Sequence, residues 1–362
     1  MSLSVALRHD FGGFSLDLAF EAPPGLTVLF GRSGSGKTSV IKAVAGLLRP
    51  DAGRIATPDR VLFDSAKGRV LPVHRRRIGY IFQEPRLFPH LTVRRNLTYG
   101  RRFAPGRGDV AEVDRVVEML GLGPLLARRP GALSGGEQSR VAIGRALLCA
   151  PEILLADEPL AALDEARKEE ILPYFERLRD ETDIPILYVS HAVAEVARLA
   201  SWVVALEQGR ITRAGPAVEV FADPAFAATG GRDAGALIEA RILTHHADGL
   251  TEVQAGDARF YLPQTPGQPG QGLRLRIAAQ DVMLAREAPR GLSALNILPG
   301  IVTEIGQGTG PGVLIRLTTP AGPILAAITR RSLAAMGLTT GTPCHAIIKS
   351  VAIAPRQGPG AG

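Results

Sequence analysis

The chain of 362 residues is long enough for two or three domains, each able to bury its own core. Apolar residues make up 46% of it and charged residues 21%, a globular composition that excludes collagen-like and wholly disordered proteins. The net charge of +7 is compatible with nucleic-acid binding, with anionic lipid or simply with an arginine-rich composition. The basic residues form short, scattered clusters without zinc spacing or an aromatic RNA-binding signature, which favours the last of these, so nucleic-acid binding is not expected.

Cysteine content and hydropathy indicate the compartment of the protein and its relation to a membrane. Cys149 and Cys344 lie far apart in apolar stretches, so we expect a reducing compartment, without a disulfide framework or a tetrahedral metal site. The first residues lack the profile of a signal peptide, and no run of about 18 apolar residues exists to cross a bilayer. Any work at a membrane therefore requires docking onto a partner that spans it.

The first predicted elements are a buried strand at 26–30 and a helix from Thr38 to about Leu48, which Arg49-Pro50 stops. Between them, GRSGSGKT fits the phosphate-binding pattern GxxxxGK[ST] in its required context. Its glycines let successive backbone N–H groups face inward, and the helix N-terminus favours anions. Candidate ATP-binding residues are Gly31, Arg32, Ser33, Gly34, Ser35, Gly36, Lys37 and Thr38.

Four more apolar runs, at 79–83, 152–157, 184–190 and 202–209, predict strands buried on both faces. Helical stretches separate them, which indicates an α/β domain with a mostly parallel sheet. One of these helices, expected at 165–180, contains Pro173, which should kink it or mark its true start.

The strand at 152–157 ends in two carboxylates. Asp157, together with the Thr38 hydroxyl, is a candidate ligand for Mg²⁺, and Glu158 is a candidate general base or orienting group for water. Upstream, LSGGE at 133–137 opens an amphipathic helix, and its Ser134 forms either a second anion-binding helix end or a plain N-cap.

The order GRSGSGKT, LSGGE, LLADE resembles the ABC ATPase family, over roughly residues 3–225. The resemblance implies that Gln83 is the Q-loop glutamine, a catalytic residue near Mg²⁺, and that His191 is the switch histidine at the γ-phosphate. Of Phe11 and Phe14, we favour Phe11 as the aromatic that stacks on adenine. The signature LSGGE ends in Glu137, where the family most often has Gln. The D-loop at 161–164 begins with Ala161, where Ser is frequent. Both are tolerated variants in the family.

Family members close ATP between the P-loop of one copy and the LSGG helix of another. The chain holds one set of motifs, so the resemblance implies a homodimer and argues against the tandem-motif ABC proteins of translation and DNA repair. The residues that would then act in trans are Ser134, Gly135, Gly136 and Asp164.

Small residues, Gly and Pro replace periodic apolar positions at 222–236, where we place a domain boundary. We expect a nucleotide-binding domain at 1–230, a β-rich domain at 236–355 and a disordered tail at 356–362. Residues 272–285 resemble the start of the regulatory domain of binding-protein-dependent importers, and 293–354 resemble the molybdate-binding Mop module, a small OB-like TOBE-type barrel. Candidate oxyanion donors are Ser293, Asn296, Lys349 and Ser350.

The fold class expected is therefore an α/β P-loop NTPase domain followed by a small all-β OB-like domain. The whole chain resembles ATPase subunits of molybdate or tungstate importers, which implies ATP and Mg²⁺ as cofactors and a peripheral place on the cytoplasmic face of the inner membrane. Permease subunits would dock near Glu84–Asn96, and an extracytoplasmic oxyanion-binding protein would act indirectly. The alternatives are ATPases of sulfate, iron, polyamine or sugar importers, and a P-loop enzyme such as a kinase.

Overall fold

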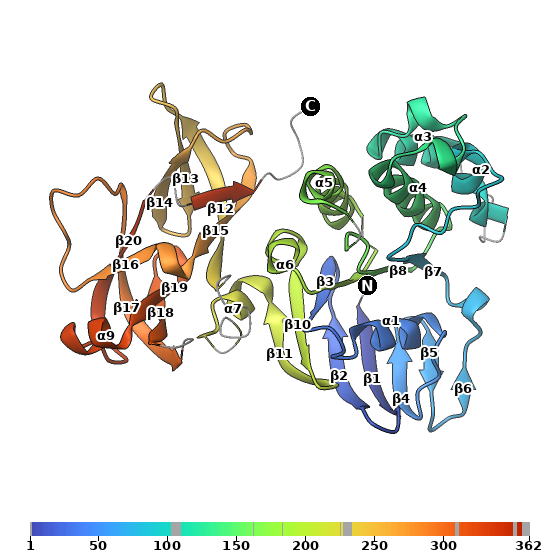
Figure 1. Ribbon diagram of the computed structural model, residues 1–362, viewed down its shortest axis with the longest axis horizontal. Coiled ribbons are helices and arrows are strands. Elements are labelled where there is room, and N and C mark those ends of the chain that lie inside the picture. Colours follow the sequence, from blue (N-terminus) through green and yellow to red (C-terminus); the bar gives the residue numbers. More distant parts are fainter. Residues whose placement is uncertain are drawn as a thin grey trace. The chain divides into compact units, whose positions relative to one another are not determined.

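The computed structural model in Figure 1 describes residues 2–102, 110–161, 163–182, 184–224, 226, 234–307, 311–349 and 353–356. The chain divides into two compact units, Met1–Ala214 and Gly215–Gly362. This division lies earlier than the boundary expected at 222–236, because helix α7 (Ala217–Phe221) contacts strand β12 (Gly235–His245) of the second unit. Apart from Arg356, which ends a strand, the tail expected at 356–362 lies outside the described residues.

The first unit contains an antiparallel sheet that the sequence analysis did not identify, with the strand order β2-β1-β4-β5-β6. Its strands β1 and β2 alternate between buried and exposed residues, as expected for a sheet with one face on a core. The strands are β1 (Leu3–Asp10), β2 (Ser15–Ala22), β4 (Ala52–Ala56), β5 (Val61–Asp64) and β6 (Arg69–Val70).

The second sheet of this unit has the order β11-β10-β3-β9-β8-β7, and the pairs from β10 through β7 are parallel. Every residue of β3 and β9 is buried, which confirms the predicted α/β architecture. The strands are β3 (Leu26–Phe30), β7 (Ile78–Ile81), β8 (Ile153–Asp157), β9 (Ile186–Ser190), β10 (Trp202–Glu207) and β11 (Arg210–Pro216).

The two sheets share one core with helix α1 (Lys37–Ala45), in which Leu16, Leu29 and Ile41 are fully buried. The helix ends at Gly46, whose φ of 82° is left-handed, so it stops earlier than predicted and leaves Leu47 55% exposed. This packing fixes the start of α1 at the end of β3.

The remaining helices of the first unit are α2 (Val93–Thr98), α3 (Val110–Met119), α4 (Gly135–Leu147), α5 (Glu165–Glu181) and α6 (Val193–Leu199). Helices α2 and α3 both contact α4 and gather around it in Figure 1. Helix α5 begins at Glu165 and continues through Pro173, so the proline does not mark its start. Burial of Ile171 and Phe175 on one face outweighs the backbone hydrogen bond that the proline removes.

The second unit consists of two antiparallel five-stranded sheets, β14-β13-β12-β15-β21 and β16-β20-β17-β18-β19, which share one apolar core. Their further strands are β13 (Leu250–Ala255), β14 (Ala258–Pro263), β15 (Gly272–Ala278), β16 (Val282–Ala285), β17 (Asn296–Gln307), β18 (Gly312–Thr319), β19 (Gly322–Thr329), β20 (Pro343–Ile348) and β21 (Ile353–Arg356). The predicted all-β character is confirmed.

Two apolar runs of the second unit, LRLRIAAQDVML at 273–284 and HAIIKSVAIA at 345–354, each read as one strand in the sequence but are divided between the two sheets. The first run forms parts of β15 and β16, separated by a 3₁₀ turn at Ala279–Asp281, and the second forms parts of β20 and β21. A short helix, α9 (Arg330–Ala335), was not predicted, although Thr329 caps it by accepting a hydrogen bond from the Ser332 N–H. Across the described residues, no helix is long and apolar enough to cross a membrane.

Candidate functional site

The sequence motifs of the first unit meet at one edge of the parallel sheet. The register pairs Phe30 with Ser190, Asp157 with Val189, and Ile81 with Ala156. The segments that follow these strands therefore leave the sheet side by side. The phosphate-binding loop follows β3, Glu158 follows β8, His191 follows β9 and Gln83 follows β7.

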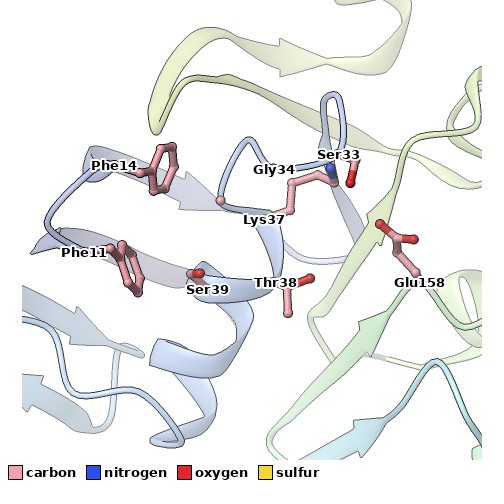
Figure 2. A pocket seen from close by; sticks show the side chains of 9 residues that line it. Phe11, Phe14, Ser33, Gly34, Lys37, Thr38, Ser39 and Glu158 are labelled. Atoms are coloured by element: carbon pink, nitrogen blue, oxygen red, sulfur yellow. The ribbon is translucent and has the colours of Figure 1, made fainter.

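A pocket of about 270 Å³ opens at the phosphate-binding loop (Figure 2). Gly36, with a φ of 101°, is required there because an added Cβ would collide with Leu16 and press on the Phe14 ring. Figure 2 shows Lys37 and Thr38 between the two phenylalanines and Glu158. The lining residues are Phe11, Phe14, Ser33, Gly34, Gly36, Lys37, Thr38, Ser39 and Glu158.

The two candidate adenine-stacking aromatics differ in exposure. Phe11 is 46% exposed, and its ring packs edge-on against His9 at 4.4 Å between ring centroids. Phe14 packs against the core that the two sheets share. Both rings line the pocket, and the ring of Phe11 is the more exposed of the two.

The Lys37 amine is hydrogen-bonded to carbonyls of the phosphate-binding loop (P-loop) itself. Lys37 Nζ donates hydrogen bonds of 2.8 Å to the carbonyls of Gly31 and Arg32. Burial lowers the pKa of Lys37, while the nearby carboxylates of Glu158 and Asp157 act in the opposite direction. The Ser35 hydroxyl is buried and has no hydrogen-bond partner in the described part of the chain, and Ser35 is not among the residues that line the pocket.

The Asp157 carboxylate is fixed by two hydroxyl donors. Thr38 Oγ1 donates to Asp157 Oδ1 at 3.0 Å, and the Tyr80 hydroxyl donates to Oδ2 at 2.9 Å. Burial, and then the Asp157 charge, raise the pKa of Tyr80, which keeps its hydroxyl a donor. The adjacent oxygens of Thr38 and Asp157 fit a hard divalent cation such as Mg²⁺. Tyr80 was missed in the sequence, since nothing in the run GYIFQ distinguishes it from a core residue.

Glu158 and His191 form a pair at the mouth of the pocket. His191 Nδ1 lies 3.4 Å from Glu158 Oε2, and the two side chains are 58% and 23% exposed. Glu158 has a φ of 46°, a left-handed conformation that is costly for a residue with a Cβ and that is concentrated at functional sites. The structure thus brings together Lys37, Thr38, Asp157, Glu158 and His191.

Ser134 and Asp164 lie at exposed helix N-termini. The Ser134 hydroxyl accepts from the Glu137 N–H at 3.2 Å, and Glu137 Oε2 accepts from the Ser134 N–H at 2.7 Å, a capping box for α4. Asp164 caps α5 by accepting from the Arg167 N–H at 3.0 Å. Both residues serve as caps, and both are exposed at the surface of the chain. Gly135 and Gly136 form the first turn behind Ser134.

Gln83 is exposed, and the segment after it is held by two side chains that the sequence analysis did not single out. The fully buried Asn96 accepts from the Phe88 N–H at 2.9 Å and donates to three carbonyls, those of Phe88, Leu91 and Thr92. Arg145 of α4 donates to the carbonyls of Arg86 and Pro85 at 2.8 and 3.0 Å. The backbone of the segment expected to dock a permease is therefore fixed by side-chain hydrogen bonds.

The candidate oxyanion donors of the second unit fall into different environments. Asn296 is 1% exposed, and its amide exchanges hydrogen bonds of 2.8 and 3.1 Å with the backbone of Tyr261, so it ties β17 to β14. Ser293 and Lys349 are exposed, and the pairing of Asn296 with Ile348 brings Lys349 to the start of β17. Ser350 lies outside the described residues.

Comparisons with known proteins cover both units. A family model described as ABC transporter matches residues 16–161, and one described as TOBE domain matches residues 292–355. The molybdenum import ATP-binding protein ModC of Rhizobium meliloti is 52% identical, covering 98% of this chain and 99% of that protein. The proteins of the same name from Mesorhizobium japonicum and Brucella abortus are 50% and 46% identical, covering 100% and 97% of this chain and 98% and 97% of those proteins.

Two solved structures share the fold of part of the chain. The cbiO1 protein of Clostridium perfringens, part of the ABC transporter complex cbiONQ, has a TM-score of 0.54 at 28% identity, covering 61% of this chain and 90% of that one. MJ0796, a bacterial ABC transporter cassette with a dimeric structure, has a TM-score of 0.50 at 24% identity, covering 60% and 99%. Both agree with the predicted P-loop fold.

Proposed function

Because the chain belongs to the family of ABC transporter ATP-binding proteins, we propose that it hydrolyses ATP to power a molybdate or tungstate importer. The observation that supports ATP hydrolysis is the pocket in which Lys37 and Thr38 face the Glu158–His191 pair. The substrate assignment is supported by the whole-length similarity to proteins named for molybdenum import.

Each residue of the pocket has a distinct task in this proposal. The Lys37 amine exchanges its loop carbonyls for the β- and γ-phosphates. Thr38 and Asp157 would hold Mg²⁺, and Gln83, which follows β7 at the same edge of the sheet, would join them as the family resemblance implies. When bound, the cation neutralises charge that develops on the phosphates.

The Glu158–His191 pair is suited to act on the attacking water. The Glu158 carboxylate accepts a hydrogen bond from the water and orients it, and His191 keeps the γ-phosphate and the carboxylate in place. The Phe11 ring stacks on adenine. A kinase would need a binding site for a second substrate, whereas the motif LSGGE on its exposed helix end favours closure by a second copy.

Three kinds of partner belong to this proposal: a second copy of the chain, permease subunits and an oxyanion-binding protein. We infer a homodimer in which Ser134, Gly135, Gly136 and Asp164 of one copy complete the pocket of the other, since both helix ends are exposed. Permease subunits dock on the surface at 84–96, which holds the protein peripherally at the cytoplasmic face of the inner membrane. An oxyanion-binding protein outside the cytoplasm delivers the substrate to that permease.

Transport by reconstituted vesicles tests the proposal. Proteoliposomes holding the protein with its permease should accumulate molybdate only with ATP and the oxyanion-binding protein, and Lys37→Ala should abolish both accumulation and hydrolysis. Accumulation of sulfate, iron, a polyamine or a sugar in place of molybdate would identify one of the alternative importers. ATP-dependent transfer of phosphate to a cosubstrate would identify a kinase.

We further propose that the second unit binds the oxyanion and thereby restrains hydrolysis when the intracellular anion is plentiful. The donors would be Ser293, Lys349 and Ser350, while Asn296 shapes the site through Tyr261. Calorimetric titration of the full chain with molybdate, with sulfate as the control, should give heat that Lys349→Ala removes. No heat at millimolar anion would leave the unit with a dimerisation role alone.

A further inference from the structure

A buried carboxylate outside the nucleotide pocket collects three donors. Glu195, on α6, is 6% exposed. Its Oε2 accepts hydrogen bonds from the Ser190 hydroxyl at 2.8 Å and from the Tyr188 hydroxyl at 3.1 Å, and its Oε1 lies 3.5 Å from Lys168 Nζ. Burying a carboxylate is costly unless it is paired and hydrogen-bonded, and these three partners stabilise the buried charge of Glu195.

The first arm of the cluster holds the chain on both sides of the switch histidine. Ser190 ends β9, directly before His191, and its hydroxyl donates to Glu195 while it accepts from the Ala192 N–H at 3.0 Å. The His191 side chain is 58% exposed, so packing does little to orient it. Its approach to Glu158 therefore depends on the backbone that the Ser190 hydroxyl fixes.

The second arm leads from Glu195 to helix α5, which begins directly after Asp164, one of the residues expected to act in trans. Lys168 lies on the first turn of α5, and its N–H donates to the carbonyl of the N-cap residue Asp164 at 3.0 Å. One carboxylate thus joins the backbone at His191 to the helix end at Asp164.

We propose that Glu195 is a positioning residue that fixes His191 against Glu158 and joins this pair to the start of α5. The inference deepens the proposed ATPase function and rests on it. Glu195 does not line the nucleotide pocket, and it acts through Ser190 on one side and Lys168 on the other.

Glu176 provides a matched control because it is a buried carboxylate that joins the same two helices. It is 3% exposed on α5 and accepts from Arg198 of α6 at 2.7 and 3.2 Å. This pair ties α5 to α6 through neither Ser190 nor Lys168. Glu176→Gln therefore reports the effect of a weakened helix contact alone.

The test compares steady-state ATP hydrolysis by the full chain and four variants. Glu195→Ala and Ser190→Ala should lower kcat by about 10- to 100-fold with KM within about twofold, since binding is kept and alignment is lost. Glu195→Gln retains an oxygen for Ser190 and Tyr188 and should restore kcat to within a few-fold of the wild type. Glu176→Gln should keep kcat.

A second readout does not depend on hydrolysis. In ¹³C-histidine-labelled protein, the His191 ring signal, assigned by its loss in His191→Ala, should move or broaden in Glu195→Ala and Ser190→Ala but not in Glu176→Gln. Ser190→Ala is a small substitution that the fold should tolerate. An unchanged His191 signal and an unchanged kcat in this variant would overturn the inference. Equal losses in Glu176→Gln and Glu195→Ala would also overturn it. A wild-type chain that hydrolyses no ATP would contradict the proposed function, while the His191 signal would still test the positioning.

Discussion

Glu158 combines a strained backbone with a partly exposed carboxylate beside His191. We predict that Glu158→Gln binds ATP normally and hydrolyses it about 10²- to 10⁴-fold more slowly, because the amide no longer polarises water. Lys37, Thr38 and Asp157 are untouched by the change, so nucleotide affinity should persist. Single-turnover hydrolysis and nucleotide titration measure the two effects separately.

The control for this variant is Glu152→Gln, at the other end of the same strand. Glu152 pairs with Arg60 and Arg77 at 3.2 and 2.8 Å, away from the pocket. Its loss should leave the turnover rate unchanged. Near-normal turnover by Glu158→Gln would remove Glu158 from the role assigned to it.

The two phenylalanines at the pocket should respond differently to truncation. Phe11→Ala should weaken ATP binding by about 1–3 kcal/mol, the usual contribution of a base stacked on an aromatic ring. Phe14→Ala should instead lower the stability of the first unit by about 1–3 kcal/mol, because its ring packs on the core. Calorimetric titration and urea unfolding separate these outcomes, and the reverse pattern would make Phe14 the stacking residue.

Residues that belong to a recognisable motif could be predicted, and residues outside any motif that act across elements could not. Lys37 and Thr38 belong to one loop whose spacing is itself informative. Tyr80 reaches Asp157 from another strand, and Glu195 reaches Ser190 from the next helix. Such contacts depend on tertiary placement that periodicity does not reveal.

At the scale of elements, Asn96 holds the segment between β7 and α2 with four hydrogen bonds to its backbone. Asn96→Ala would remove all four hydrogen bonds, and it should destabilise the segment by about 1–3 kcal/mol. Hydrogen exchange of peptides covering 84–96 should accelerate, together with a loss of permease-stimulated ATP hydrolysis.

Thr92→Ala is the control, since Thr92 only caps α2 through a hydrogen bond of 3.4 Å from the Arg95 N–H. It should cost about 0.5–1 kcal/mol, with little change in exchange beyond the helix start. Equal protection of 84–96 in wild type and Asn96→Ala would show that other contacts hold the segment.

The sequence located buried strands better than the places where elements stop. Strand 26–30 is present with the predicted bounds, because a short apolar run between turn signals leaves little choice. The helix after it ends at Gly46, since a glycine that adopts a left-handed conformation terminates it before the apolar pattern does. The run 272–285 crosses from one sheet to the other, and an apolar run alone does not reveal such a crossing.

At the scale of the whole molecule, apolar runs that alternate with helical stretches were enough to predict the α/β class, and the β pattern and family resemblance beyond residue 236 predicted the all-β unit that follows it. The antiparallel sheet that contains β1, β2 and β4 was missed, because the neighbouring strands β1 and β2 alternate in burial rather than forming the continuous apolar runs that marked the parallel sheet, and β4 joins them only after α1. Residues 217–221 form α7, which contacts β12, and composition does not reveal such a long-range contact.

A mixing experiment tests whether two copies share each pocket. Ser134→Arg places a bulky cation where a second copy's γ-phosphate should bind, and it should abolish hydrolysis, as should Lys37→Ala. In a mixed dimer, the intact P-loop of the Ser134→Arg copy faces the intact LSGGE helix of the Lys37→Ala copy. An equal mixture of the two inactive proteins should therefore recover about a quarter of the wild-type rate, since half of the dimers are mixed and each has one complete site. Ser134→Thr, which keeps a capping hydroxyl, is the control for loss of the α4 cap. Normal hydrolysis by Ser134→Arg alone, or no recovery in a mixture that forms dimers, would contradict the shared site.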